Sequence, residues 1–121
     1  CTVDETTGEE LTPLAHSSSQ RVFAEQTAEK LQELLAGVVA EGTGRQAAPS
    51  EGTAAGKTGT AQTGQFRDGE ELKNYWFAGF YPAEKPRWTI VVMQDAQTEP
   101  EASSAAVFAR LCDALAAGED G

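Results

Sequence analysis

Two apolar runs late in the chain constrain its fold more than any other feature. They cover residues 75–81 and 87–94, and the five residues between them, 82–86, include two prolines. Runs of this length, rich in aromatic and β-branched side chains and joined by a short connection, predict an antiparallel pair of strands. Apolar residues stand at successive positions rather than at every second one. This predicts strands that are covered on both faces.

Helical patterns lie on either side of these strands. Apolar residues recur at three- and four-residue steps through residues 19–41 and again through residues 98–117. A serine near Ser19 is suited to capping the first helix, and Thr98 opens a capping-box pattern with an early proline before the second. Gly118 is expected to end the second helix.

The remaining segments complete a single α+β domain. Residues 1–18 predict a short hairpin with an acidic turn, followed by a lead-in to the first helix. A third strand is expected from residue 54, followed by a long polar turn over residues 63–74. Consecutive strands joined by turns pair antiparallel, so residues 54–95 predict a three-stranded antiparallel sheet with helices packed on it.

Charge and cysteine content exclude several kinds of partner. The formal net charge is −10, which opposes binding to nucleic acid and to an anionic membrane surface. No apolar run approaches the roughly 18–20 residues of a membrane span, so we expect any anchor to lie in a segment not present here. Cys1 and Cys112 show no metal-binding or redox spacing. We therefore expect no metal and no cofactor.

Residues 54–62 carry the most suggestive chemistry. Lys57 stands in a run of small and β-branched residues, with Gly56 before it and Gly59 after it. Glycines leave the main chain open to a second chain or an acyl group. In an extended segment, Thr58 and Thr60 fall on one side. Two hydroxyls, backbone N–H groups and an ammonium predict a site for a carboxylate or a developing oxyanion.

Two other interpretations compete for this stretch. A phosphate-binding loop would need a glycine at position 51, where the chain has Glu51, and Gly52 comes one residue late. A helix should also follow such a loop, yet the next residues are rich in threonine and glycine. The second interpretation is an edge strand whose solvated lysine guards against aggregation, and spacing alone favours it.

The order of segments around Lys57 resembles a known family. The run at residues 57–62 is similar to the Lys-Thr-Gly motif of penicillin-binding transpeptidases and serine β-lactamases. Residues 38–44 before it, and residues 76–82 and 88–93 after it, match the C-terminal third of class B penicillin-binding proteins, including those of cell division and sporulation. The resemblance covers nearly the whole chain. It implies part of a transpeptidase or β-lactamase-like fold.

The resemblance also implies roles for individual residues. Lys57 would supply positive potential and a hydrogen bond to a serine of the family's Ser-x-Asn motif. The Thr60 N–H would be an oxyanion donor, and Thr58 and Thr60 would hold the carboxylate of a D-alanyl-D-alanine stem peptide or of a β-lactam. Gly59 would let the substrate lie along the strand. Gln62 would lie at the edge of the substrate or serve as structural support.

Two motifs of the family are absent from the chain. None of the four lysines has a serine three residues before it, and Asn74, the only asparagine, has Leu72 two residues before it. Without Ser-x-x-Lys and Ser-x-Asn the chain holds no nucleophile, and we expect it to be inactive alone.

The implied parent is a serine-type D,D-transpeptidase on the extracytoplasmic face of a bacterial cytoplasmic membrane. The expected partners of this chain are then the missing N-terminal part of the domain and a stem peptide or β-lactam. The alternatives are a β-lactamase or β-lactam sensor, and a non-catalytic interaction module. Because the apolar strands would be left partly uncovered without the rest of the domain, we also expect a homo-oligomer.

Overall fold

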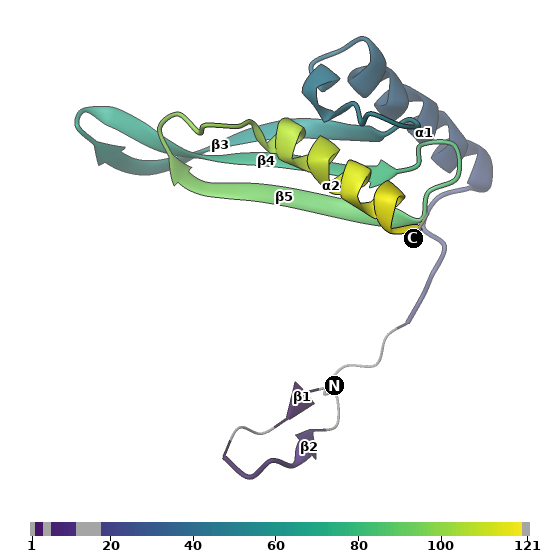
Figure 1. The fold of residues 1–121 in the computed structure, drawn as a ribbon, viewed down its shortest axis with the longest axis horizontal. Helices are drawn as coiled ribbons and strands as arrows, with labels where there is room; N and C mark the ends of the chain where they lie inside the picture. Colours follow the sequence, from purple (N-terminus) through teal and green to yellow (C-terminus); the bar gives the residue numbers. More distant parts are fainter. Residues whose placement is uncertain (1, 4–5, 12–17, 120–121) are drawn as a thin grey trace.

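The computed structural model describes residues 2–3, 6–11 and 18–119. Its α+β architecture is the predicted one, an antiparallel three-stranded sheet with two helices (Figure 1). A short pair of strands at the N-terminus stands apart from this sheet in Figure 1. The elements in chain order are β1 (Thr2–Val3), β2 (Glu10–Leu11), α1 (Glu25–Ala40), the 3-10 turn η1 (Arg45–Ala47), β3 (Ala55–Arg67), β4 (Glu70–Tyr81), β5 (Trp88–Gln97) and α2 (Ser104–Glu119).

The main sheet has β4 at its centre. The strand order is β3-β4-β5, and both pairs are antiparallel. Across β4, Phe77 is paired with Thr58 of β3 and with Val92 of β5, while Lys57 is paired with Ala78. Lys57 therefore lies on an edge strand, with which no second strand pairs on its outer side in the described part of the chain.

One face of the sheet forms the core. Phe77 and Phe108 are fully buried, and their ring centroids lie 4.6 Å apart. Helix α2 runs across β4 and β5 and supplies Phe108 (Figure 1). The end of α1 and the turn η1 add Val39 and Ala47 to the same cluster. Alternate side chains of a strand share a face. Helices α1 and α2 and the turn η1 therefore all contribute core residues on the face of β4 that carries Phe77.

The opposite face is open. Trp76, Val91 and Met93 alternate with the core residues and are 38%, 57% and 45% exposed. The expectation that the two apolar strands are covered on both faces is therefore wrong for the described chain. The apolar runs encode two apolar faces, but the core cluster to which α1, η1 and α2 contribute lies on one of them.

The connection between β3 and β4 is shorter than predicted. The expected long turn over residues 63–74 is wrong, because β3 continues to Arg67 and β4 begins at Glu70. Only Asp68 and Gly69 connect them, with φ values of 53° and 86°. Two consecutive positive φ values are typical of a type I′ turn, for which Asp-Gly is a strong sequence signal. The pairing of β3 with β4 is irregular between Gln62 and Phe66, where Gly64 has a φ of 73°.

Both long helices begin later than their patterns predicted. Helix α1 starts at Glu25 rather than near Ser19, and its N-cap, Ala24, is extended and makes no side-chain capping bond. Val22 and Phe23 are 80% and 58% exposed. An amphipathic helix is stabilised mainly by packing its apolar face. Because these side chains are exposed, they lack the packing that would stabilise a further helical turn.

Helix α2 starts at Ser104, and Ser103 rather than Thr98 caps it. The N–H of Ala106 donates to the Ser103 hydroxyl oxygen at 3.1 Å. Thr98 instead accepts a hydrogen bond at its carbonyl from the Tyr75 hydroxyl at 3.1 Å. The helix continues through Gly118, so that glycine does not end it as expected.

Candidate functional site

Lys57 is the third residue of β3 and is exposed. Its ammonium donates to the Thr58 carbonyl oxygen and to the Thr58 hydroxyl oxygen, each at 3.2 Å. The salt bridge found in the described part of the chain joins Lys30 and Glu33 and does not involve Lys57. The charge of Lys57 is therefore not neutralised by a carboxylate of the described residues, and it lies beside a hydroxyl.

The other predicted residues follow along the same strand. Alternation places Thr58, Thr60 and Gln62 on one side of β3 and Lys57 with Gly59 on the other. Thr58 is half-buried, whereas Thr60 and Gln62 are exposed. The Lys57 side chain bends along the strand to reach Thr58, so its ammonium lies next to a hydroxyl of the other side. All five residues are thus brought together on one accessible edge strand.

The two glycines beside Lys57 differ in role. A Cβ at Gly56 would lie 2.6 Å from the Ala78 carbonyl oxygen and 2.6 Å from the Phe77 ring. Gly56 is buried and permits close packing of β3 on β4, so the idea that it opens the backbone to a ligand is wrong. A Cβ at Gly59 would meet only Trp76, at 3.6 Å, and Gly59 is exposed.

The segment that leads into β3 is anchored to β4. The Tyr81 hydroxyl donates to the Glu51 carbonyl oxygen at 2.9 Å, and burial raises the pKa of the Tyr81 phenol. Its ring also lies against Gly52, which has a φ of 75°. The N–H of Ala83 donates to the Thr53 carbonyl oxygen at 2.8 Å. These hydrogen bonds fix the start of β3 and therefore the position of Lys57, its third residue.

A second anchor ties the same segment to α2. Both the N–H and the hydroxyl of Ser50 donate to the Asp113 carboxylate, at 2.7 and 3.0 Å. The Ser103 hydroxyl also bonds Gln46 of η1. Sequence reasoning missed these residues, because the partners are about 60 positions apart and no local pattern links them.

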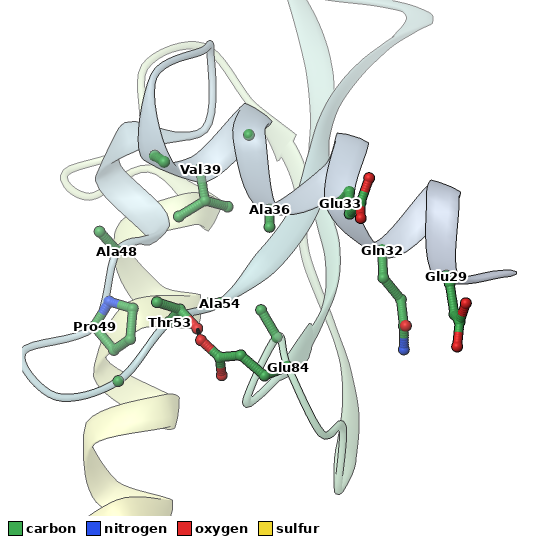
Figure 2. Close-up of a pocket in the computed structure, with 14 residues that line it drawn as sticks. Glu29, Gln32, Glu33, Ala36, Val39, Ala48, Pro49, Thr53, Ala54 and Glu84 are labelled. Atoms are coloured by element: carbon green, nitrogen blue, oxygen red, sulfur yellow. Dashed lines mark hydrogen bonds between the residues drawn. The ribbon is translucent and has the colours of Figure 1, made fainter. Parts of the chain in front are cut away.

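A hollow in the described chain lies away from these residues. It has a volume of about 580 Å³ and lies between α1 and the connection that follows β4 (Figure 2). Ala36, Val39 and Pro49 line it, and Glu84 points into it, held by a hydrogen bond from Thr53 that lowers the pKa of its carboxyl. None of the predicted site residues lines this hollow.

The described residues offer no further candidate for a metal site, a membrane span or a reactive thiol. No group of three or more histidine, cysteine, aspartate or glutamate side chains gathers there in a way that could hold a metal ion. None of the helices in the described ranges has the length and apolar character of a membrane span. Cys112 is fully buried, and burial raises the pKa of its thiol to about 11. This thiol is protonated and inaccessible, which suits a core residue.

A family model describes most of the chain. The model of the penicillin-binding protein transpeptidase domain matches residues 4–113. The chain therefore belongs to the penicillin-binding protein transpeptidase domain family, as the residues around Lys57 had predicted.

Two curated relatives are similar to the chain. Stage V sporulation protein D of Bacillus subtilis is 40% identical over 81 residues, which make up 64% of this chain and 12% of that protein. Penicillin-binding protein PbpB of Mycolicibacterium smegmatis is 37% identical over 107 residues, 73% of this chain and 16% of that protein. The chain thus spans less than a fifth of the length of these relatives.

Solved transpeptidase domains share the fold. The D,D-transpeptidase domain of a peptidoglycan glycosyltransferase from Eggerthella lenta has a TM-score of 0.66 and 30% identity, and the match covers 92% of this chain and 25% of that one. The transpeptidase domain of Burkholderia pseudomallei penicillin-binding protein 3 has a TM-score of 0.70 and 28% identity, over 89% and 35% of the two chains. The chain corresponds to part of such a domain.

Proposed function

We propose that this chain forms one wall of the acyl-transfer site of a peptidoglycan D,D-transpeptidase. This Lys57 wall consists of Lys57, Thr58, Gly59, Thr60 and Gln62. The observation that carries the proposal is an exposed ammonium, not paired with any described carboxylate, on an edge strand of a transpeptidase-family fold. The nucleophilic serine would lie on a part of the parent protein outside these 121 residues.

Each residue of the wall has a physical reason for its role. A serine hydroxyl near Lys57 would be polarised by the ammonium, and a carboxylate would be attracted to it. The free edge of β3 offers backbone N–H groups, and that of Thr60 would donate to the oxyanion formed when the serine attacks. Gly59 adds no side chain on the exposed strand, which leaves room for a substrate backbone.

The substrate class follows from the anionic end that the wall would bind. The terminal carboxylate of a D-alanyl-D-alanine stem peptide would accept hydrogen bonds from the hydroxyls of Thr58 and Thr60, with Gln62 at its margin. A β-lactam carries a carboxylate beside a strained acyl bond and would occupy the same place. Since the substrate belongs to the cell wall, the parent would act outside the bacterial cytoplasmic membrane, anchored through another segment.

Labelling with a fluorescent penicillin tests the proposal. The chain alone should remain unlabelled because it has no Ser-x-x-Lys, whereas the parent should be acylated. In the parent, Lys57→Ala should slow acylation by about 100-fold or more, the scale of losing a preorganised electrostatic contact. Lys85→Ala is the control, because Lys85 is also exposed but lies on the connection between β4 and β5. Covalent labelling of the chain, or equal effects of the two substitutions, would refute the proposal.

A further inference from the structure

The backbone polar groups of β3 point alternately towards β4 and towards the outer edge of the sheet. A Cβ at Gly56 would lie 2.6 Å from the Ala78 carbonyl oxygen, and one at Gly79 would meet the Ala55 carbonyl oxygen. The Ala78 carbonyl is therefore directed at β3, and the Ala55 carbonyl at β4. In a strand the N–H and carbonyl of one residue lie on the same side, and successive residues alternate. Thr60 lies five positions after Ala55 in a regularly paired stretch, so its N–H is directed to the outer edge.

The central strand links the two sides of the sheet through its peptide groups. Trp76 lies two positions from Ala78, so its N–H is directed at β3, where its partner is Gly59. The hydrogen-bonding pattern of such a pair joins the Trp76 N–H to the Gly59 carbonyl. The same peptide group carries the Tyr75 carbonyl, which is directed away from β3. The Gly59 carbonyl, in turn, shares a peptide group with the Thr60 N–H.

A buried serine at the start of α2 bonds the far end of these groups. Ser104 is 4% exposed, and its hydroxyl donates to the Tyr75 carbonyl oxygen at 2.9 Å. The same hydroxyl proton is shared with the side-chain oxygen of Gln94 at 2.8 Å. The Gln94 amide nitrogen donates to the Ala102 carbonyl oxygen at 2.8 Å, which fixes the orientation of the amide. Every buried polar side-chain atom of the described residues has a partner, so this network is complete within the chain.

Further hydrogen bonds hold the same part of β4. The Tyr75 hydroxyl donates to the Thr98 carbonyl oxygen at 3.1 Å, and the N–H of Ala96 donates to the side-chain oxygen of Asn74 at 2.8 Å. Ala96 has a φ of 48°, and the pairing of β4 with β5 is irregular next to Tyr75. Side chains thus bond backbone groups where the ladder is interrupted. The peptide groups of β4 opposite Thr60 depend on these side chains for their position.

We propose that Ser104 positions and polarises the Thr60 N–H through two peptide groups. The Ser104 hydroxyl donates to the peptide group of Tyr75 and Trp76, and this group donates to the peptide group of Gly59 and Thr60. Hydrogen bonds in such a relay strengthen one another by about 10–30% per bond. Ser104 touches no reacting atom and is a positioning residue. The oxyanion role of Thr60 rests on the proposed function, whereas the hydrogen-bond relay does not.

Amide resonances of the ¹⁵N-labelled chain test the relay directly. In Ser104→Ala the amide proton resonances of Trp76 and Thr60 should move upfield, because both N–H groups become less polarised. The Thr58 N–H is the internal reference, since it is directed to the same edge of β3. The peptide groups behind it lead to the Phe77 carbonyl, which Ser104 does not contact. The Thr58 resonance should therefore stay in place.

Ser103→Ala is the matched control. It makes the same chemical change at the adjacent residue and removes the hydroxyl that caps α2. It should lower Tm and leave the resonances of Trp76 and Thr60 in place. Ser104→Thr keeps the hydroxyl and should keep both resonances as well. Circular dichroism verifies folding, and Ser104→Cys, which has a similar size and donates only weakly, replaces Ser104→Ala if that variant is unfolded.

Acylation of the parent by a fluorescent penicillin tests the link to catalysis. An oxyanion donor contributes about 10²–10³-fold, and a loss of about 10–30% of that contribution slows the acylation step about two- to eightfold. Ser104→Ala should show this effect at saturating penicillin. The penicillin concentration for half-saturation should stay within about twofold, because the oxyanion forms only in the transition state. Ser103→Ala should change neither quantity.

Two results would overturn the inference about the chain itself. They are unchanged Trp76 and Thr60 resonances in a folded Ser104→Ala protein, and equal shifts in Ser103→Ala. A resonance shift without slower acylation, in a parent that Lys57→Ala does slow, would also overturn it. A parent that penicillin does not acylate refutes the proposed function instead, and the resonances alone then decide the relay. Shifts confined to Ser104→Ala, with a slower acylation step, support the inference.

Discussion

Replacing Gly56 by alanine should destabilise the chain, while the same change at Gly59 should not. At position 56 the new Cβ would lie 2.6 Å from both the Ala78 carbonyl oxygen and the Phe77 ring. The oxygen belongs to β4, which pairs with β3, and Phe77 is fully buried, so neither can move aside freely. Overpacking of this kind costs about 1–3 kcal/mol. The loss of unfolded-state freedom offsets about 0.4–1 kcal/mol of it.

The net effect at Gly56 is therefore a destabilisation of about 1–2 kcal/mol. A chain of 121 residues loses about 4 °C in Tm for each kcal/mol, so Tm should fall by about 4–8 °C. At Gly59 the nearest atom is the Cβ of Trp76 at 3.6 Å, an ordinary contact. Only the gain from unfolded-state entropy then remains, and Tm should rise by about 2–4 °C.

Thermal unfolding followed by circular dichroism in dilute solution measures both variants. The two substitutions are chemically identical and only three residues apart, so a difference in sign reports the local environment. A Gly56→Ala protein as stable as the wild type would refute the packing role assigned to that glycine. It would also revive the interpretation that both glycines serve ligand access.

Three further predictions concern the core, the buried thiol and pH. Phe108→Ala should cost about 3–5 kcal/mol in denaturant unfolding because its ring is fully buried against Phe77; a loss below 1 kcal/mol would contradict this. In a variant lacking the other cysteine, Cys112 should react with a thiol reagent at pH 8 only as fast as the chain unfolds, because its pKa is about 11; labelling faster than unfolding would contradict it. The lowered pKa of Glu84 means that its carboxylate stabilises the folded chain above the usual value of 4.5 and that this stabilisation is lost as pH falls through the lowered pKa. Thr53→Val removes the hydrogen bond behind the shift and should flatten that acid dependence in urea titrations.

The sheet could be predicted from the sequence because its signals are local. Runs of aromatic and β-branched residues mark β4 and β5, and the five-residue connection between them favours antiparallel pairing. The Asp68–Gly69 turn had an equally local signal, which the polar and glycine-containing residues around it obscured. Because this two-residue turn stands where a long connection was expected, β3 and β4 are longer than predicted. The Asp-Gly pair is a local signal for such a turn, so this part of the fold is encoded in the sequence.

Other features depend on contacts that no local pattern reports. Which face of β4 is covered depends on where α1 and α2 pack, and both contribute core residues to the face of Phe77. The Ser50–Asp113 anchor joins positions 63 residues apart. The onset of α1 at Glu25 depends on the absence of packing for Phe23 rather than on a missing helical period. Periodicity predicts the type of an element far better than its partner.

The position of Lys57 limits where the rest of an acyl-transfer site could come from. Around Phe77 this side of the sheet is filled by α2 and the end of α1, so an attacking serine could not approach there, whereas Thr60 and Gln62 on the same side of β3 are exposed. The remaining routes are the free edge of β3 and the open face around Trp76.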